Sequence, residues 1–430
     1  MNREILRLAL PALGSLAADP LVSLVDTAFV GRIDDTALAA LAVNAAIFGV
    51  VFFLFNFLAY GTTPLVAGAE AAGEPAVARR AISAAAILAG GLGVSAFVVL
   101  QVGGPWLLDV MQTPDAAQAD ALSYLRIRAF AAPAVLLMLV GHGAFRGRQD
   151  TATPLRVTLA FNLVNLILDP VLIFAVGWGL AGAAVATTIA QWMGAVWFGA
   201  LLWQDWAGVR EARTLLPRMM RVGRDLTLRT VALLGALTVA TAVAARAGVA
   251  IVAGHQVVSQ LWLLTTLILD ALAVAAQALV GRLVGQGDED RLRLLTYRLA
   301  GWSVLVGFVI AGVFAVLLPL LPALFGATGE TATEIRSALP LLVALQPLGA
   351  LVFIGDGLYI GASRFRLLTV STLAAGAATI GYYLVAEPQS LSAVWWGIAV
   401  LLAVRLAFFV VDFALHRTVA PPPTVVYTTK

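Results

Sequence analysis

The stretch LALPALGSLAADPLVSLVDTAFVGR, from Leu8 to Arg32, is long and apolar enough to cross a lipid bilayer, yet it carries Asp19 and Asp26. A carboxylate at membrane depth is costly, and it therefore indicates a functional site. Pro20 has no backbone N–H to offer the preceding turn, so the helix can bend between the two acids. We interpret Asp26 as a functional carboxylate and Pro20 as a hinge. The alternative is that Asp26 only pairs with a neighbouring helix.

The composition indicates a polytopic membrane protein. Of the 430 residues, 61% are hydrophobic and 12% are charged, and the mean hydropathy is +0.94. Soluble domains do not have this profile. The chain has no cysteine, which excludes disulfides and thiolate metal sites. We expect no cleavable signal peptide, because Met1 to Arg7 leads directly into a full-length span.

Apolar runs of about 20 residues or more predict all-α architecture with twelve membrane-spanning helices. None of the longer runs contains a turn signal strong enough to divide it. The predicted helices are 5–30, 37–67, 76–99, 119–145, 155–176, 180–203, 226–246, 251–283, 292–317, 335–360, 365–385 and 393–415.

The basic residues of the loops predict the orientation of these helices. With both termini on one side, that side holds 21 of the 27 Lys and Arg residues, the other side holds 3, and Arg126, Arg128 and Arg405 fall within helices. The bias places both termini in the cytoplasm. The single Lys against 26 Arg favours a GC-rich bacterium as the source, so we expect the bacterial plasma (inner) membrane. The resulting division is an N-lobe (1–205), a cytoplasmic linker (206–225), a C-lobe (226–417) and a cytoplasmic tail (418–430).

The two halves repeat each other. At a constant offset of 214 residues, several glycines and prolines coincide, among them Gly73 with Gly287, Pro105 with Pro319, Pro133 with Pro347, Gly141 with Gly355, Gly143 with Gly357, and Gly147 with Gly361. Six helices in each half give both halves the same orientation, so a pseudo-two-fold axis along the membrane normal relates them. Transporters place their substrates between such halves. The alternative is duplication used only for packing.

Polar residues of the N-half converge on one depth. Asp26, Asp169, Thr187 and Tyr124 all lie within about 8 to 11 Å of the outer ends of their helices, at about 1.5 Å per residue. Asn165 lies one turn below Asp169 on the same helical face. Such a set holds a proton between carboxylates or offers oxygens to a sodium ion. The alternative for Asn165, Thr187 and Tyr124 taken singly is ordinary hydrogen bonding between helices.

A second group of polar residues is assigned to a substrate cavity. It consists of Asp19, Asn56, Asp270 and Asp356. Asp270 and Asp356 are equally well explained by structural ion pairs. Arg405 and Asp412 lie near the cytoplasmic end of the last helix, where we expect both side chains to snorkel to the surface.

Several motifs together resemble the DinF branch of the multidrug and toxic compound extrusion (MATE) family, over about residues 3 to 417. They are VDTAFVGR from Val25, NLVN from Asn162 with LDP from Leu168, AAVATTIAQ from Ala183, LDALAVAAQALVG from Leu269, and Asp356-Gly357 followed by Gly361-Ala362-Ser363. The resemblance implies two six-helix lobes and the export of cationic or amphipathic compounds in exchange for protons or sodium. It also implies that Asp26 couples the ion, with Asn165, Asp169 and Thr187 around it. The helix 7 carboxylate of the NorM branch has no counterpart here.

Other functions fit less well. An enzyme is not expected, because His142, His255 and His416 are scattered without metal-ligand spacing. A passive channel needs a continuous polar lining. The main alternative is a lipid or lipid-linked precursor flippase of a related two-lobe fold, which an arginine-rich cavity favours. We expect no cofactor beyond the coupling ion, no resident metal, no nucleic-acid partner, and a monomer in the lipid bilayer that binds small molecules.

Overall fold

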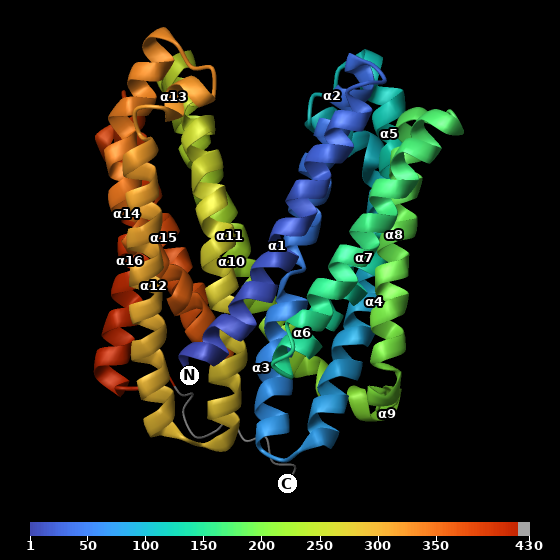
Figure 1. Ribbon diagram of the computed structural model, residues 1–430, viewed down its shortest axis with the longest axis vertical. Coiled ribbons are helices and arrows are strands. Elements are labelled where there is room, and N and C mark those ends of the chain that lie inside the picture. The colour runs from blue at the N-terminus through green and yellow to red at the C-terminus, as the bar shows by residue number, and fades with distance from the viewer. Residues whose placement is uncertain (420–430) are drawn as a thin grey trace. The chain divides into compact units, whose positions relative to one another are not determined.

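The computed structural model describes residues 1–419, and within them the chain is helical without strands (Figure 1). The predicted tail 418–430 lies mostly outside the described residues. The helices form two compact units. The N-terminal unit is Leu10–Gly223, and the C-terminal unit combines Met1–Ala9 with the chain from Arg224 onward.

The N-terminal unit contains most of α1 and the helices up to the start of α10. Their bounds are α1 (Asn2–Val30), α2 (Asp35–Leu54), α3 (Phe57–Ala71), α4 (Pro75–Val110), α5 (Asp115–Ala129), α6 (Ala132–Gly147), α7 (Ala152–Pro170), a π-helical turn η1 (Val171–Ala175), α8 (Gly179–Leu201), a 3-10 turn η2 (Trp203–Asp205) and α9 (Val209–Ala212).

The C-terminal unit contains the remaining helices. They are α10 (Leu216–Ala247), α11 (Val249–Gln286), α12 (Glu289–Leu317), α13 (Leu321–Leu324), α14 (Gly329–Gly361), α15 (Phe365–Ala386) and α16 (Leu391–His416). Helix α10 begins inside the segment predicted as a linker, and the first nine residues of the predicted N-lobe belong to the C-terminal unit.

The predicted number of spans is confirmed. In the described residues, eleven helical segments are long and apolar enough to cross a membrane, and α5 with α6 forms a twelfth that is bent by 48°. The expectation of undivided helices was wrong at two places. Pro133 has no N–H for the carbonyl of Ala129, and the chain bends there. At Phe55 and Asn56 the backbone changes to i→i−3 hydrogen bonds without any proline.

Close helix contacts at glycine repeat between the units. A Cβ at Gly93 would lie 2.5 Å from the Cα of Pro133, and a Cβ at Gly307 would lie 2.8 Å from the Cα of Pro347. Both pairs are related by the 214-residue offset. Glycine is required at these positions because the backbones meet without room for a side chain. The sequence repeat is thus also a repeat of packing.

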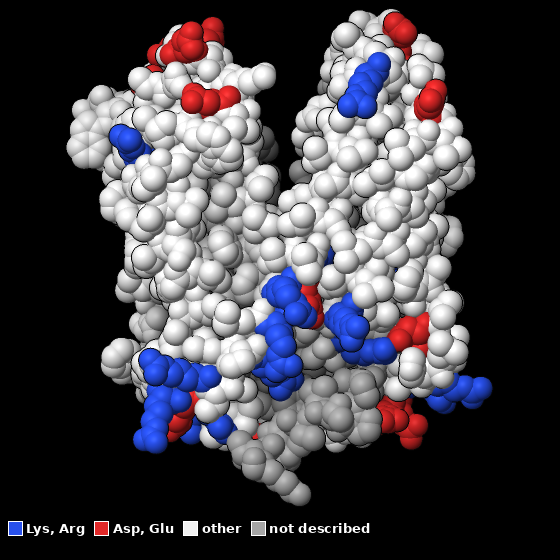
Figure 2. All heavy atoms as spheres, turned by 180° about the vertical axis from the view of Figure 1, so that it is seen from behind, with Lys and Arg blue, Asp and Glu red and all other residues white. Residues whose placement is uncertain are grey.

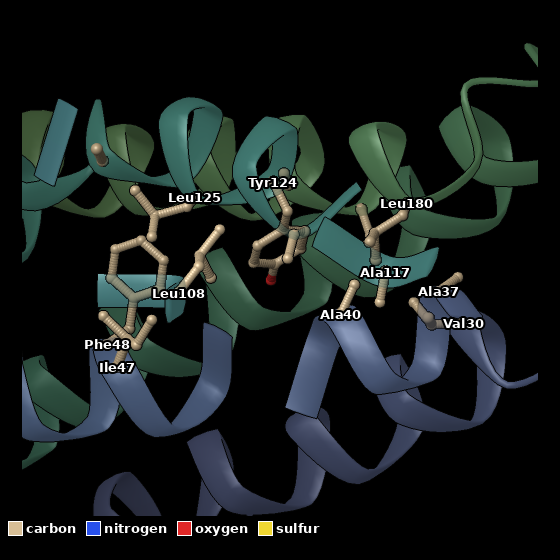
Figure 3. Packing of buried hydrophobic residues seen from close by; sticks show 14 of the residues in the cluster. Val30, Ala37, Ala40, Ile47, Phe48, Leu108, Ala117, Tyr124, Leu125 and Leu180 are labelled. Carbon is tan, nitrogen blue, oxygen red and sulfur yellow. The ribbon is translucent and has the colours of Figure 1, made fainter. Parts of the chain in front are cut away.

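A buried apolar cluster between α2, α5 and neighbouring helices supports the polar residues of the N-terminal unit. Figure 3 shows Phe48 and Ile47 of α2 near Leu125 of α5, and Tyr124 in the same layer. Ala40 and Ala117 allow the two helices to approach closely. Tyr124 is only 8% exposed, because this cluster surrounds its ring.

Basic side chains are unevenly distributed along each unit. In Figure 2 they gather mainly at the end where α3 joins α4 and α11 joins α12 in Figure 1. This agrees with the loop bias from which the cytoplasmic side was predicted.

Candidate functional site

A cavity of about 490 Å³ opens inside the N-terminal unit between α1, α2, α5, α7 and α8. Four of the five residues predicted to couple an ion line it: Asp26, Tyr124, Asn165 and Thr187. The fifth, Asp169, lies behind this wall and is fully buried. Helical depth had predicted that these residues are neighbours, and the structure brings them together.

The carboxyl groups of Asp26 and Asp169 lie close enough to interact with each other. An ionised carboxylate only accepts hydrogen bonds, so a hydrogen bond between the two groups requires a proton on one of them. Each residue also has one buried carboxyl oxygen without a partner among the described residues. The pair is therefore suited to hold one proton, and it leaves acceptor capacity unused.

Asn165 holds the carboxyl group of Asp169 in place, and Thr187 lies beside Asn165. Asn165 Nδ2 donates to Asp169 Oδ2 over 3.0 Å, and the same nitrogen lies 3.5 Å from Thr187 Oγ1. Thr187 donates to the carbonyl of Ala183 at 2.9 Å. Asn165 thus uses its amide N–H groups on Asp169 and Thr187.

The backbone changes its helix type just after Asp169. Pro170 follows it directly and supplies no N–H to the last turn of α7. The chain continues as η1, in which the N–H of Val176 bonds to the carbonyl of Val171 at 2.8 Å. Such π-helical turns occur frequently at functional sites, and this one ends the regular helix next to the acid.

Arg128 and Gln191 complete the cavity, and neither was predicted as a site residue. Arg128 is 8% exposed, donates to Gln191 Oε1 at 2.6 Å, and lies 5.3 Å from the ring centre of Phe48. It also interacts electrostatically with Asp26. The sequence did contain a signal for Arg128, because an arginine within a membrane-spanning helix commonly faces a cavity.

Asp19 and Pro20 also line the cavity, one helical turn or more from Asp26. Asn162 Nδ2 donates to Asp19 Oδ1 at 2.7 Å, which ties α1 to α7. Helix α1 runs without interruption through Pro20. The hinge role of Pro20 therefore stays a prediction.

Two members of the predicted substrate group lie in the C-terminal unit. Asp356 is 7% exposed, and it accepts hydrogen bonds from Arg229 at 2.6 Å and from Arg405 at 2.5 Å. The structural ion pair, one of the two alternatives for Asp356, is thus present. Asp270 is half-buried on α11. Asn56 lies at the break between α2 and α3 and does not line the cavity of the N-terminal unit.

The expectation that Arg405 and Asp412 snorkel was wrong. Arg405 is 3% exposed because Asp356 of α14 offers it a buried partner. Asp412 is 8% exposed, and it accepts two hydrogen bonds from Arg364 and one from Tyr359. Partners from distant parts of the chain thus retain both side chains inside the protein.

Comparison with known proteins settles the family. A family model described as MatE matches residues 11–171 and, a second time, residues 228–383. The chain belongs to the MATE family. The two matches fall in the two halves of the repeat, and the family consists of transporters, so transport rather than catalysis is the function.

Relatives of this MATE chain occur in plants and bacteria. It is 37% identical to Protein DETOXIFICATION 44, chloroplastic, of Arabidopsis thaliana, over 94% of this chain and 81% of the relative. It is 28% identical to DNA damage-inducible protein F of Escherichia coli, over 94% and 90% of the two chains, which supports the DinF branch. A MATE crystal structure in the bent conformation matches with a TM-score of 0.87 at 21% identity, over 97% of this chain and 94% of that chain.

Proposed function

We propose that this chain is a proton-coupled antiporter that exports cationic or amphipathic organic compounds, and that Asp26 and Asp169 carry the exchanged proton. The observation that supports this most strongly is the closeness of the two carboxyl groups at the wall of the cavity. A proton bound there is exchangeable, because Asp26 reaches the cavity.

Exchange follows because a proton and a cationic compound compete for the one negative charge of the Asp26–Asp169 pair. Burial disfavours a bare carboxylate, so the pair holds its proton when the cavity contains no other cation. A cationic compound in the cavity stabilises the ionised pair, while a returning proton removes that stabilisation and favours release. Moving a two-state equilibrium from 1:99 to 99:1 takes about 5.5 kcal/mol. A buried acid supplies this through about four units of pKa change at about 1.36 kcal/mol each.

The side-chain groups around Asp26 and Asp169 fit a bound proton better than a bound sodium ion. A sodium ion between Asp26 and Asp169 would take the place of a shared proton, and Asn165 directs an N–H rather than its oxygen at Asp169. Sodium coupling is the alternative form of this proposal. A flippase for pyrophosphate-linked lipids receives less support, since the described cavity lining has a single arginine, Arg128, beside Asp19 and Asp26.

We propose the bacterial plasma membrane as the location, with both termini cytoplasmic and the monomer as the working unit. The distribution of Lys and Arg between the loops supports the cytoplasmic termini. Three relatives from Arabidopsis thaliana are named as chloroplastic.

The test is export of ethidium from proteoliposomes under an imposed pH gradient or an imposed sodium gradient. We expect the pH gradient alone to drive export, and we expect Asp26→Asn to fold, to bind ethidium and to lose this export. Asp120→Asn, the same change at an exposed position of α5, is the matched control and should export normally. Full proton-driven export by Asp26→Asn would overturn the assignment. Export driven only by the sodium gradient would show that sodium, and not the proton, is the coupling ion.

A further inference from the structure

A second concave surface lies in the C-terminal unit, away from the cavity of the N-terminal unit. It is a groove of about 610 Å³ between α12, α14 and α16. We call it the C-groove, and the residues on which the argument depends are Arg293, Tyr297, Ala300, Ile354, Phe409 and Arg417.

The walls of the C-groove are apolar and accessible from outside. Val410 of α16 is 56% exposed, and Tyr297 of α12 is 60% exposed. The Tyr297 ring meets Phe413 edge to face, with 5.6 Å between ring centres, so the two helices are joined across the groove. In a chain whose long helices cross the membrane, such an exposed apolar face contacts lipid chains.

One end of the C-groove carries two arginines, Arg293 and Arg417, whose side chains have no partner in the described part of the chain. Neither the guanidinium of Arg293 nor that of Arg417 has a hydrogen bond or an ion pair within residues 1–419. The acid on the same helix, Asp412, already accepts two hydrogen bonds from Arg364. Tyr297 lies one turn from Arg293, at the level where tyrosine is enriched at membrane surfaces.

The dimensions fit one lipid. From Phe409 to Arg417 helix α16 rises about 12 Å, and one leaflet of hydrocarbon is about 15 Å thick. The apolar part of the groove therefore extends through most of one leaflet, and its basic end lies at headgroup depth. Basic pockets between helices at this depth bind anionic headgroups.

We propose that the C-groove binds an anionic phospholipid, with its phosphate at Arg293 and Arg417 and an acyl chain along α16. The site is separate from the carboxyl pair and does not depend on the coupling ion. It is also specific to one unit, as the repeat shows.

The N-terminal unit contains the repeat-related groove with different chemistry. Offsetting by 214 residues relates Ala86 to Ala300, Val140 to Ile354 and Trp203 to Arg417, and the first residue of each pair lines a smaller groove of about 380 Å³. At the position that corresponds to Arg417, this groove has Trp203. Its carboxylate, Asp205, is already bound by Arg148 at 2.6 and 2.9 Å. Among residues 1–419, the lining of this groove offers no arginine or lysine to a phosphate.

The test is native mass spectrometry of the full chain in a nonionic detergent, titrated with phosphatidylglycerol or with phosphatidylcholine of the same acyl chains. We expect selective retention of phosphatidylglycerol. Arg293→Gln with Arg417→Gln should weaken its binding about thirtyfold, or about 2 kcal/mol at about 1 kcal/mol per arginine. Arg79→Gln with Arg80→Gln removes the same charge from the other unit and should change binding less than about twofold.

A large side chain introduced into each groove tests which groove binds the acyl chain. Ala300→Trp should abolish retention of phosphatidylglycerol, whereas Ala86→Trp in the repeat-related groove should preserve it. Melting temperatures of all variants establish that they are folded. Equal binding of both lipids, unchanged binding by the double arginine variant, or equal binding of free glycerol phosphate would overturn the proposal, since the last result indicates a phosphate site without a lipid chain.

Discussion

The carboxyl groups of Asp26 and Asp169 are direct neighbours, although only Asp26 reaches the cavity. Asp26 belongs to α1 and Asp169 to α7, next to a proline and a π-helical turn. One acid is therefore open to exchange, and the other is enclosed. This asymmetry gives the two carboxyl groups different expected roles.

Replacing Asp169 by Asn should move the pH at which export is half-maximal, because two interacting carboxyl groups titrate as a pair and a single group does not. The measurement is ethidium export over a pH series in proteoliposomes. Asp115→Asn, at the start of α5, is the control for loss of an acid. An unchanged pH profile in an active protein would leave Asp169 as a packing residue.

Pro20→Ala should slow export without abolishing binding of ethidium, because alanine restores an N–H for the carbonyl of Leu16 and stiffens α1. Pro11→Ala, in the same helix but outside the cavity lining, is the matched control. Turnover and equilibrium binding are measured separately on both variants. Equal turnover of wild type and Pro20→Ala would remove the hinge role.

Arg405→Leu should destabilise the protein by about 1 to 3 kcal/mol, since the buried Asp356 loses one of its two arginine partners while Arg229 remains. Thermal unfolding in detergent measures the effect. Arg336→Leu, at an exposed position of α14, should stay within about 0.5 kcal/mol of wild type. Equal shifts for both variants would show that the contact with Asp356 does not contribute specifically.

Single cysteines should establish the topology, because the chain has none of its own. Cysteines at Asp115 and Glu330 should react with an impermeant maleimide from outside the cell, and those at Arg213 and Glu289 only after permeabilisation. These positions avoid Gly73 and other glycines with positive φ, where a cysteine is strained. Labelling of Glu330 and Glu289 from the same side contradicts the twelve-span count.

The site in the N-terminal unit was predicted from the depth of each polar residue along its membrane-spanning helix. Along a spanning helix the residue number gives depth directly, and this suffices to place Tyr124 and Thr187 level with Asp26. Depth does not give the direction of a side chain around the helix. Arg128 was therefore not assigned to the cavity, although it was recognised as lying within a span.

Partners from distant segments limited the remaining predictions. Arg405 is 49 residues from Asp356 along the chain, and Arg229 is 127 residues from it. No local pattern connects these three residues, so snorkelling was the expected outcome for Arg405. The break at Phe55 was missed for a related reason, since no proline or glycine marks it in the sequence.

The complete burial of Asp169 has a kinetic consequence. Water does not touch this carboxyl group, so its proton must arrive through a neighbour that water does touch. Among the described acids, Asp26 is the neighbour in contact with both. The exchange rate of the enclosed proton is then limited by how often Asp26 turns from the cavity toward α7. If the pair carries the exchanged proton, as proposed, we expect Asp26 to act as a relay whose speed sets an upper limit on turnover.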